Sequence, residues 1–170
     1  MSHITIRTEI IADIKICFNL ARSIDFHKES LKHTGEIPVA GKTTGMVELG
    51  EWVSWEAKHL GFVQHFTTKV TAFESPNLFI VEMVFGAFKS YLHEHRFYKE
   101  GQKTIMVQKM FFETPYGILG KLFNSIFLKG YMSRLIKTRN AALKVRAESM
   151  HMENVLGAKS RDFQKHILQF

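Results

Sequence analysis

Apolar and polar residues alternate near the start of the chain and again through its centre, and this alternation predicts strands. Ile4, Ile6 and Ile10 fall on one side of the segment from His3 to Ile10, which is the pattern of a half-buried strand. Residues 51–113 alternate in the same way and are divided by four short breaks that contain Gly or Pro. These breaks are Gly61-Phe62, Ser75-Pro76-Asn77, Gly86-Ala87 and Glu100-Gly101. Because Gly and Pro favour tight turns, we expect five antiparallel strands here.

Helical patterns flank the strands. Asp13 can accept hydrogen bonds from the first turn of a helix that places Cys17, Phe18 and Ala21 on one side. A second short helix is predicted over residues 23–33, followed by a loop with a short strand near Met46 to Leu49.

The C-terminal third changes to a helical period after Pro115, which predicts one long helix from about Gly117 to about Glu148. We expect a single domain over residues 1–150. Residues 151–170 form an extension, either a docked helix or a flexible tail. This order of elements predicts an α+β fold in which a curved antiparallel sheet of about seven strands grips the long helix.

The composition narrows the class of protein. The chain has 170 residues, 45% of them hydrophobic and 23% charged, enough for one sizeable core. Collagen-like, disordered and disulfide-scaffold classes are excluded. Cys17 is the only cysteine, which removes disulfides within the chain and thiolate metal clusters. No apolar stretch is long enough to span a membrane, and the N-terminus lacks the apolar region of a signal peptide, so we expect a cytoplasmic protein.

The net charge of +7 permits anionic partners without requiring them. Basic residues on the predicted long helix are more typical of a solvated face than of a nucleic-acid site, so we expect no nucleic-acid partner. Transient contact of this helix with an anionic membrane is an alternative. No glycine-rich phosphate loop is present, and we expect no cofactor.

Hairpin geometry predicts which side chains share a face. If Gly86-Ala87 and Glu100-Gly101 are two-residue loops, one face of three neighbouring strands combines apolar residues with several polar ones. Its members are Leu78, Ile80, Glu82, Val84, Tyr91, His93, His95, Phe97, Met106, Gln108, Met110 and Phe112. The Gly61-Phe62 turn adds Val53, Trp55, Ala57 and His59, together with Phe66, Thr68, Val70 and Ala72.

The polar side chains on this face suggest a cavity that holds water or a ligand, because buried polar groups must be paired or solvated. Pairing among themselves in a filled core is the alternative. The opposite face of the strand at residues 78–85 is also apolar, with Phe79, Val81, Met83 and Phe85. Those residues meet the small helices or a partner subunit, or else they form the inner face.

His93 and His95 have the spacing of two metal ligands on one strand, and Glu82 or His59 could complete a site. Only two ligands are secured by spacing, so we expect no metal. The same histidines beside Glu82 could instead carry out acid/base catalysis. No nucleophile is identified.

Three segments carry a resemblance to a known family: GEWVSWEAKHLG, VFGAFKSYLHEHRF and ETPYGILGKLFNSIFLKGYMSRLIKTRN. They resemble the ligand-binding SRPBCC proteins of the START/Bet v1-like superfamily, of the small bacterial stand-alone type, over roughly residues 4–148. The resemblance implies a helix-grip fold whose cavity takes lipids, sterols, polyketides or other apolar molecules. Some branches are cyclases or hydrolases. Relatives tend to have Asp where this chain has Gln108.

We therefore expect a protein that binds a small to medium hydrophobic ligand with one polar group. Transport or sequestration of this ligand is a further hypothesis. Binding is favoured over catalysis, and a cyclase- or hydratase-like enzyme using His93, His95 and Glu82 is the alternative. Monomer and homodimer both remain open. The predicted ligand-binding residues are Trp55, His59, Glu82, Tyr91, His93, His95, Phe97, Met106, Gln108 and Met110.

Overall fold

The computed structural model describes residues 1–59, 62–114 and 127–167, with their side chains except at 58, 59, 62 and 159–167. Short helices follow the first strand, and one long helix follows the last. The elements are β1 (Ser2–Ile10), α1 (Ile14–Ala21), α2 (Ile24–Ser30), a 3-10 helix (Lys32–Thr34), β2 (Ile37–Gly41), β3 (Trp52–His59), β4 (Phe62–Glu74), β5 (Leu78–Phe85), β6 (Ser90–Glu100), β7 (Lys103–Glu113) and α4 (Lys129–Ile167).

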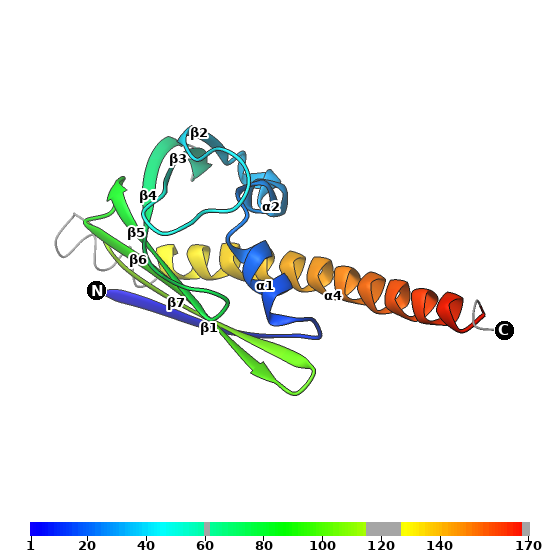
Figure 1. Ribbon diagram of the computed structural model, residues 1–170. Helices are drawn as coiled ribbons and strands as arrows, with labels where there is room; N and C mark the ends of the chain where they lie inside the picture. Colours follow the sequence, from blue (N-terminus) through cyan, green and yellow to red (C-terminus); the bar gives the residue numbers. More distant parts are fainter. Residues whose placement is uncertain (60–61, 115–126, 168–170) are drawn as a thin grey trace.

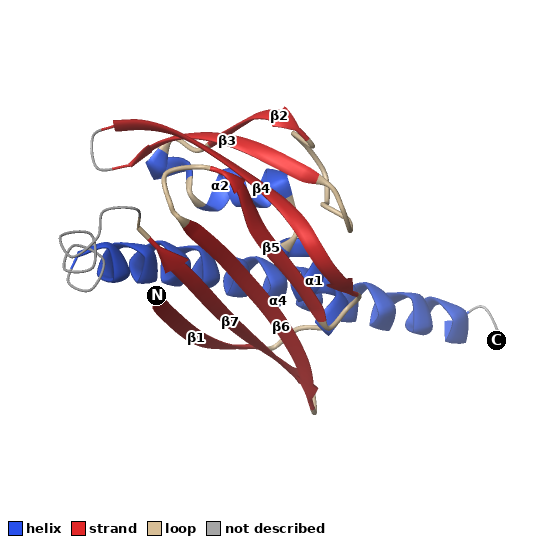
Figure 2. Cartoon of the chain, turned by 90° about the vertical axis from the view of Figure 1, so that its left-hand side faces the viewer, coloured by secondary structure: helices blue, strands red, loops and turns tan. Residues whose placement is uncertain are grey.

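The strands form one antiparallel sheet of seven strands in the order β1-β7-β6-β5-β4-β3-β2. The sheet is strongly curved, and α4 runs along its concave side (Figure 1). Figure 2 looks onto the convex face of the sheet, and α1, α2 and α4 all lie behind the strands. The predicted α+β fold, a curved sheet around a long C-terminal helix, is confirmed.

The two short helices begin where the sequence places a capping side chain. The Asp13 carboxylate accepts a hydrogen bond from the Lys15 amide at 2.8 Å. The Ser23 hydroxyl accepts one from the Phe26 amide at 3.2 Å. Both bonds satisfy first-turn N–H groups that have no partner within the helix.

The first edge of the sheet differs from the prediction. The short strand expected near Met46 to Leu49 is wrong, because β2 lies at Ile37–Gly41 and pairs with β3. Met46 forms only an isolated bridge with Ser23. The strand ends at Gly41, whose φ of 75° is in the region that favours glycine.

The β6–β7 hairpin is shifted by two residues from the prediction. Glu100 pairs with Lys103, so the two loop residues are Gly101 and Gln102. His95 then lies opposite Gln108 instead of Met106. A shift of two residues leaves every side chain on the face that was predicted, because side chains alternate with a period of two.

The β5–β6 register is shifted by one residue, and the predicted inner face of β5 is therefore wrong. His93 pairs with Val81 instead of Ile80. Gly86 does not have a positive φ. A side chain there would overlap the Phe66 ring, so this glycine permits close packing instead of a two-residue turn. Phe79 and Val81 consequently face the concave side, and Glu82 faces outward.

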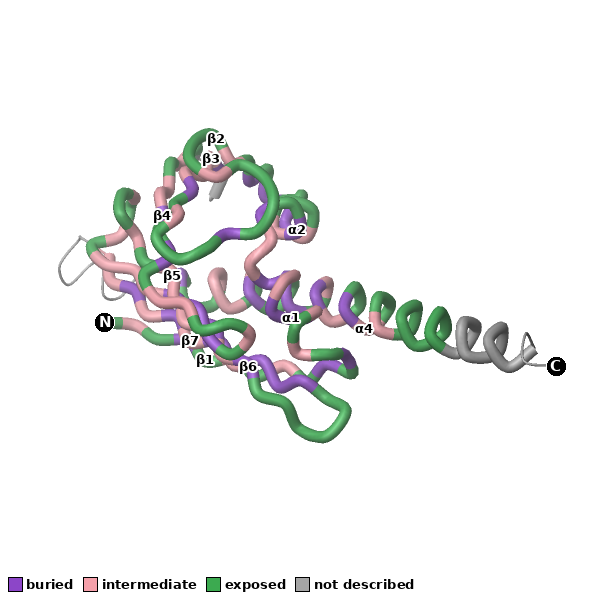
Figure 3. The backbone as a smooth tube through the Cα atoms, in the orientation of Figure 1, coloured by how far each residue is buried: buried purple, intermediate pink, exposed green. Residues whose placement is uncertain are grey.

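The long helix extends further than predicted. Its predicted start near Gly117 lies outside the described residues, whereas its end is at Ile167. Residues 151–167 continue the same helix instead of docking separately. Figure 3 shows buried positions on α4 beside the sheet and exposed positions toward the C-terminus. No helix in the described part of the chain is long and apolar enough to cross a membrane.

The apolar interior forms three clusters. Phe18 of α1 packs edge-on against Phe73, Phe79 and Phe97 of the sheet. A second cluster joins β1 and β7 to the start of α4 through Met110, Phe112, Leu128 and Ile136, with Ile4. A third comprises Ile24, Val47, Val53 and Val70. Each cluster supplies residues to the wall of one cavity, which lies between them.

Candidate functional site

A cavity of about 240 Å³ lies beneath α4, between the helix and strands β3 to β7. Its walls are mainly apolar. Trp55 and Phe66 are paired neighbours on strands β3 and β4 and lie in the same wall. Met110 of β7 and Ile136 of α4 also line the cavity. The volume is slightly below the range of about 300–1,000 Å³ that is usual for drug-sized ligands. The space therefore suits a small apolar molecule.

One wall of the cavity is polar and comes from alternate residues of β6. Tyr91, His93 and His95 all line it. The Tyr91 hydroxyl is 3.4 Å from Nδ1 of His93, and the two imidazole centroids are 4.0 Å apart. His95 also stacks on Phe79 at 4.2 Å. Alternation along one strand thus brings three polar rings into one apolar space.

The imidazoles of this wall are neutral. Burial, together with the positive charge of Arg139, lowers the pKa of His93 to about 3. Burial also lowers the pKa of His95 well below its ordinary value, with His93 and Arg139 as further causes. Burial raises the pKa of the Tyr91 hydroxyl. At neutral pH this wall can donate or accept hydrogen bonds but carries no charge.

Several polar residues of the cavity lining were missed by the sequence analysis, and three of them lie together. Arg139 of α4, His27 of α2 and Glu36 before β2 all line the cavity. Nε2 of His27 lies 2.6 Å from Oε2 of Glu36, and the His27 ring packs on Trp55 at 4.4 Å. Burial lowers the pKa of His27, and Glu36 acts against this shift.

Arg139 is buried, and its Nη2 donates a hydrogen bond to the Ala21 carbonyl at 2.5 Å. Burial lowers the pKa of the guanidinium to about 10, so it remains charged at neutral pH. A sequence signal for Arg139 existed, because it follows Ile136 by three residues and precedes Leu143 by four. A charged residue within the buried stripe of a helix indicates an interior role.

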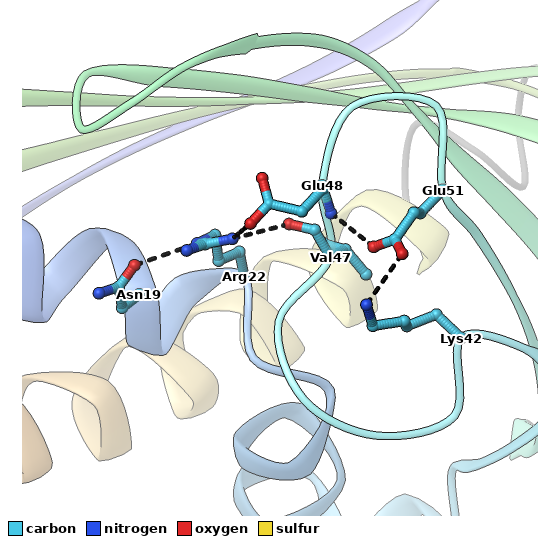
Figure 4. A network of polar contacts seen from close by, with 6 residues as sticks. All are labelled: Asn19, Arg22, Lys42, Val47, Glu48 and Glu51. Atoms are coloured by element: carbon cyan, nitrogen blue, oxygen red, sulfur yellow. Dashed lines mark hydrogen bonds and ion pairs between the residues drawn. The ribbon is translucent and has the colours of Figure 1, made fainter.

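The loop between β2 and β3 contributes Val47 and Glu51 to the cavity lining. Arg22 donates hydrogen bonds to Asn19, to the Val47 carbonyl at 3.2 Å and to Glu48 at 2.5 Å (Figure 4). Glu51 in turn accepts from Lys42 and from the Glu48 amide, both at 2.8 Å. These bonds fasten the loop to α1 and to itself, so Val47 forms a fixed part of the wall.

Comparison with solved structures finds the same architecture in several proteins. A START superfamily protein from Mycobacterium smegmatis superposes with a TM-score of 0.65 at 14% identity, over 87% of this chain and 98% of that one. Ginseng major latex-like protein 151 from Panax ginseng gives 0.64 at 13% identity, over 86% and 97%. A protein from Thermus thermophilus gives 0.67 at 18% identity, over 86% and 99%.

The chain has the helix-grip fold of the START/Bet v1-like superfamily. The fold that the resemblance implied is thus confirmed, including the likeness to bacterial stand-alone members. No family model matches the sequence. No curated protein matches it either.

Within this helix-grip structure, several of the predicted site residues come together. Trp55, Tyr91, His93, His95 and Met110 line the cavity. Their roles toward a ligand remain a prediction.

Phe97, Met106 and Gln108 are on the predicted face but lie in the buried core beside the cavity wall. The Gln108 amide donates to Nδ1 of His95 at 3.0 Å and so orients that ring. Gln108 therefore supports the polar wall from behind.

One predicted residue does not join the helix-grip cavity. Glu82 is exposed on the outer face, where its carboxylate accepts a hydrogen bond from the Thr71 hydroxyl at 2.8 Å. Its predicted place beside His93 is wrong, because the one-residue shift between β5 and β6 reverses its side. The His59 side chain lies outside the described residues.

The metal alternative finds no support in the residues that can be assessed. Among the described side chains, no group of three His, Cys, Asp or Glu residues is placed to hold an ion. His93 and His95 are adjacent, but Glu82 is on the other side of the sheet. The described contacts of the two imidazoles with polar side chains are hydrogen bonds, Tyr91 to His93 and Gln108 to His95.

Proposed function

We propose that this protein binds a small hydrophobic ligand that carries one polar group, inside the cavity beneath α4. The observation that carries the proposal is the cavity itself: about 240 Å³ of largely apolar space with one wall of buried polar side chains. Apolar walls favour a ligand by removing its surface from water, and a few converging polar groups orient it. The shared fold is consistent with this role, since such proteins commonly bind hydrophobic ligands.

Catalysis is the weaker candidate. The acid/base scheme needed Glu82 beside His93 and His95, and Glu82 lies on the outer face. A general base works best when its pKa is near the working pH. The low pKa of His93, about 3, makes it a poor base at neutral pH. Binding needs only the apolar space and its polar wall. Catalysis would also need a carboxylate beside the histidines and a base with a pKa near neutral pH.

The test compares the wild type with a variant whose cavity is filled by a larger side chain, and it measures binding of Nile red, a neutral apolar dye. Ala57 is buried and lines the cavity, so Ala57→Phe places a benzyl group in the space. Ala141→Phe adds the same group to the exposed side of α4 and is the matched control. We expect Ala57→Phe to weaken dye binding on the order of tenfold or more.

Native mass spectrometry of the freshly purified protein should detect a small molecule that Ala57→Phe lacks. Thermal unfolding of each variant establishes that it is folded. Equal dye affinity in the wild type and a folded Ala57→Phe, with no retained small molecule in either, would contradict the proposal.

A further inference from the structure

Two buried hydrogen-bonding atoms on the cavity wall lack a partner among the described residues. They are Nε of Arg139 and Nε2 of His93, and each belongs to a residue that lines the cavity. Buried polar atoms are nearly always paired, so an unpaired one beside an open space marks a place where a bound group is expected. One atom comes from α4 and the other from β6.

Both atoms are donors. The guanidinium of Arg139 carries a hydrogen on Nε and has no acceptor atom. For His93, the neighbouring Tyr91 hydroxyl keeps its proton and lies 3.4 Å from Nδ1. We assign that hydroxyl as the donor to Nδ1, which places the imidazole proton on Nε2. An acceptor is therefore missing at both positions.

The charges around the cavity favour an anionic acceptor near Arg139. Arg139 is the buried positive group beside the histidines. Arg22 also lines the cavity, but its guanidinium donates to the Val47 carbonyl and to the Glu48 carboxylate. His27, His93 and His95 are neutral. The Glu36 carboxylate also acts on Arg139, but it lies 2.6 Å from Nε2 of His27, and Nε of Arg139 still lacks an acceptor among the described residues. Charge-assisted hydrogen bonds from Arg to a carboxylate are about twice as strong as neutral ones.

We infer that the ligand of this cavity is an apolar molecule with a carboxylate end, which accepts hydrogen bonds from Nε of Arg139 and Nε2 of His93. This inference rests on the proposed function and names the class of ligand. Its apolar part lies against the side of the cavity formed by Trp55 and Val53. Nη2 of Arg139 already donates a hydrogen bond to the Ala21 carbonyl, and this bond holds the guanidinium in place.

The test compares three molecules with the same eight-carbon chain: octanoate, octan-1-ol and octylamine. Their binding to the full chain is measured by isothermal titration calorimetry at pH 7.5. We expect octanoate to bind on the order of tenfold more tightly than the alcohol, and octylamine to bind most weakly. This comparison uses the wild-type protein and needs no variant.

Arg139→Met then removes the proposed partner of the carboxylate. It should remove the tenfold preference for octanoate while changing the affinity for octan-1-ol by about twofold or less. Arg134→Met is the matched control, because Arg134 is an exposed arginine on the same helix. It lowers the net charge equally and should leave the preference unchanged. Thermal unfolding shows whether Arg139→Met is folded, and if it is not, the wild-type series decides.

Octanoate that binds no more tightly than octan-1-ol overturns the inference, and so does a folded Arg139→Met that keeps the preference. These outcomes leave the proposed function intact, since the alcohol still binds. If none of the three molecules binds and Nile red does not bind, the proposed function fails and the inference fails with it.

Discussion

Acidification should destabilise this protein, and His93 should account for a measurable part of the loss. Its native-state pKa is about 3, because burial and Arg139 disfavour the charged ring. The unfolded-state value is near 6.5. Between these values the unfolded chain binds a proton that the native protein excludes, so the free energy of unfolding falls as the pH falls. The loss begins below about pH 6.5 and is complete near pH 3.

The size of the effect follows from the two pKa values. Lowering the pH from 7 to 5 costs about 2 kcal/mol of stability from His93 alone. His95 and His27 add to the loss in the same direction, since burial lowers the pKa of each. The loss from His93 alone is already a large part of the stability of an ordinary domain, which is about 5–15 kcal/mol.

The measurement is urea unfolding followed by circular dichroism at pH 7, 6 and 5. His93→Phe cannot be protonated, so its stability should fall by about 2 kcal/mol less than that of the wild type between pH 7 and 5. His33→Gln changes an exposed histidine and is the control, expected to follow the wild type. Identical pH dependence in the wild type and His93→Phe would refute the reasoning that this ring is buried and neutral.

Two further predictions concern stability. Phe97→Ala should lower the free energy of unfolding in urea by about 3–5 kcal/mol, because Phe97 is completely buried. Phe85→Ala, at a residue that is 66% exposed, should lower it far less. Equal losses would contradict the assigned core. Gly41→Ala should destabilise by more than Gly101→Ala in thermal unfolding. Both glycines have positive φ, but only at Gly41 would a methyl group overlap Trp52, so equal shifts would count against the described β2–β3 pairing.

The parts of the site that could be predicted are those set by alternation along one strand. Tyr91 and His93 lie two residues apart on β6, and no choice of register can separate their faces. Arg139 and Glu36 could not be paired with them in the same way. One is on the C-terminal helix and the other precedes β2, so only the folded packing of α4 and α2 against the sheet brings them to this cavity.

Glu82 and Gln108 show which errors in strand register change the predicted function. The position of each residue opposite β6 was predicted by assuming a two-residue loop between the strands. Both assumed loops were placed incorrectly. The β6–β7 error was two residues, an even number, so Gln108 stayed behind the histidines and contacts one of them. The β5–β6 error was one residue, so Glu82 moved to the opposite face and the carboxylate of the predicted catalytic set was lost. For a half-buried strand, whether the register error is odd or even decides the chemistry of the cavity.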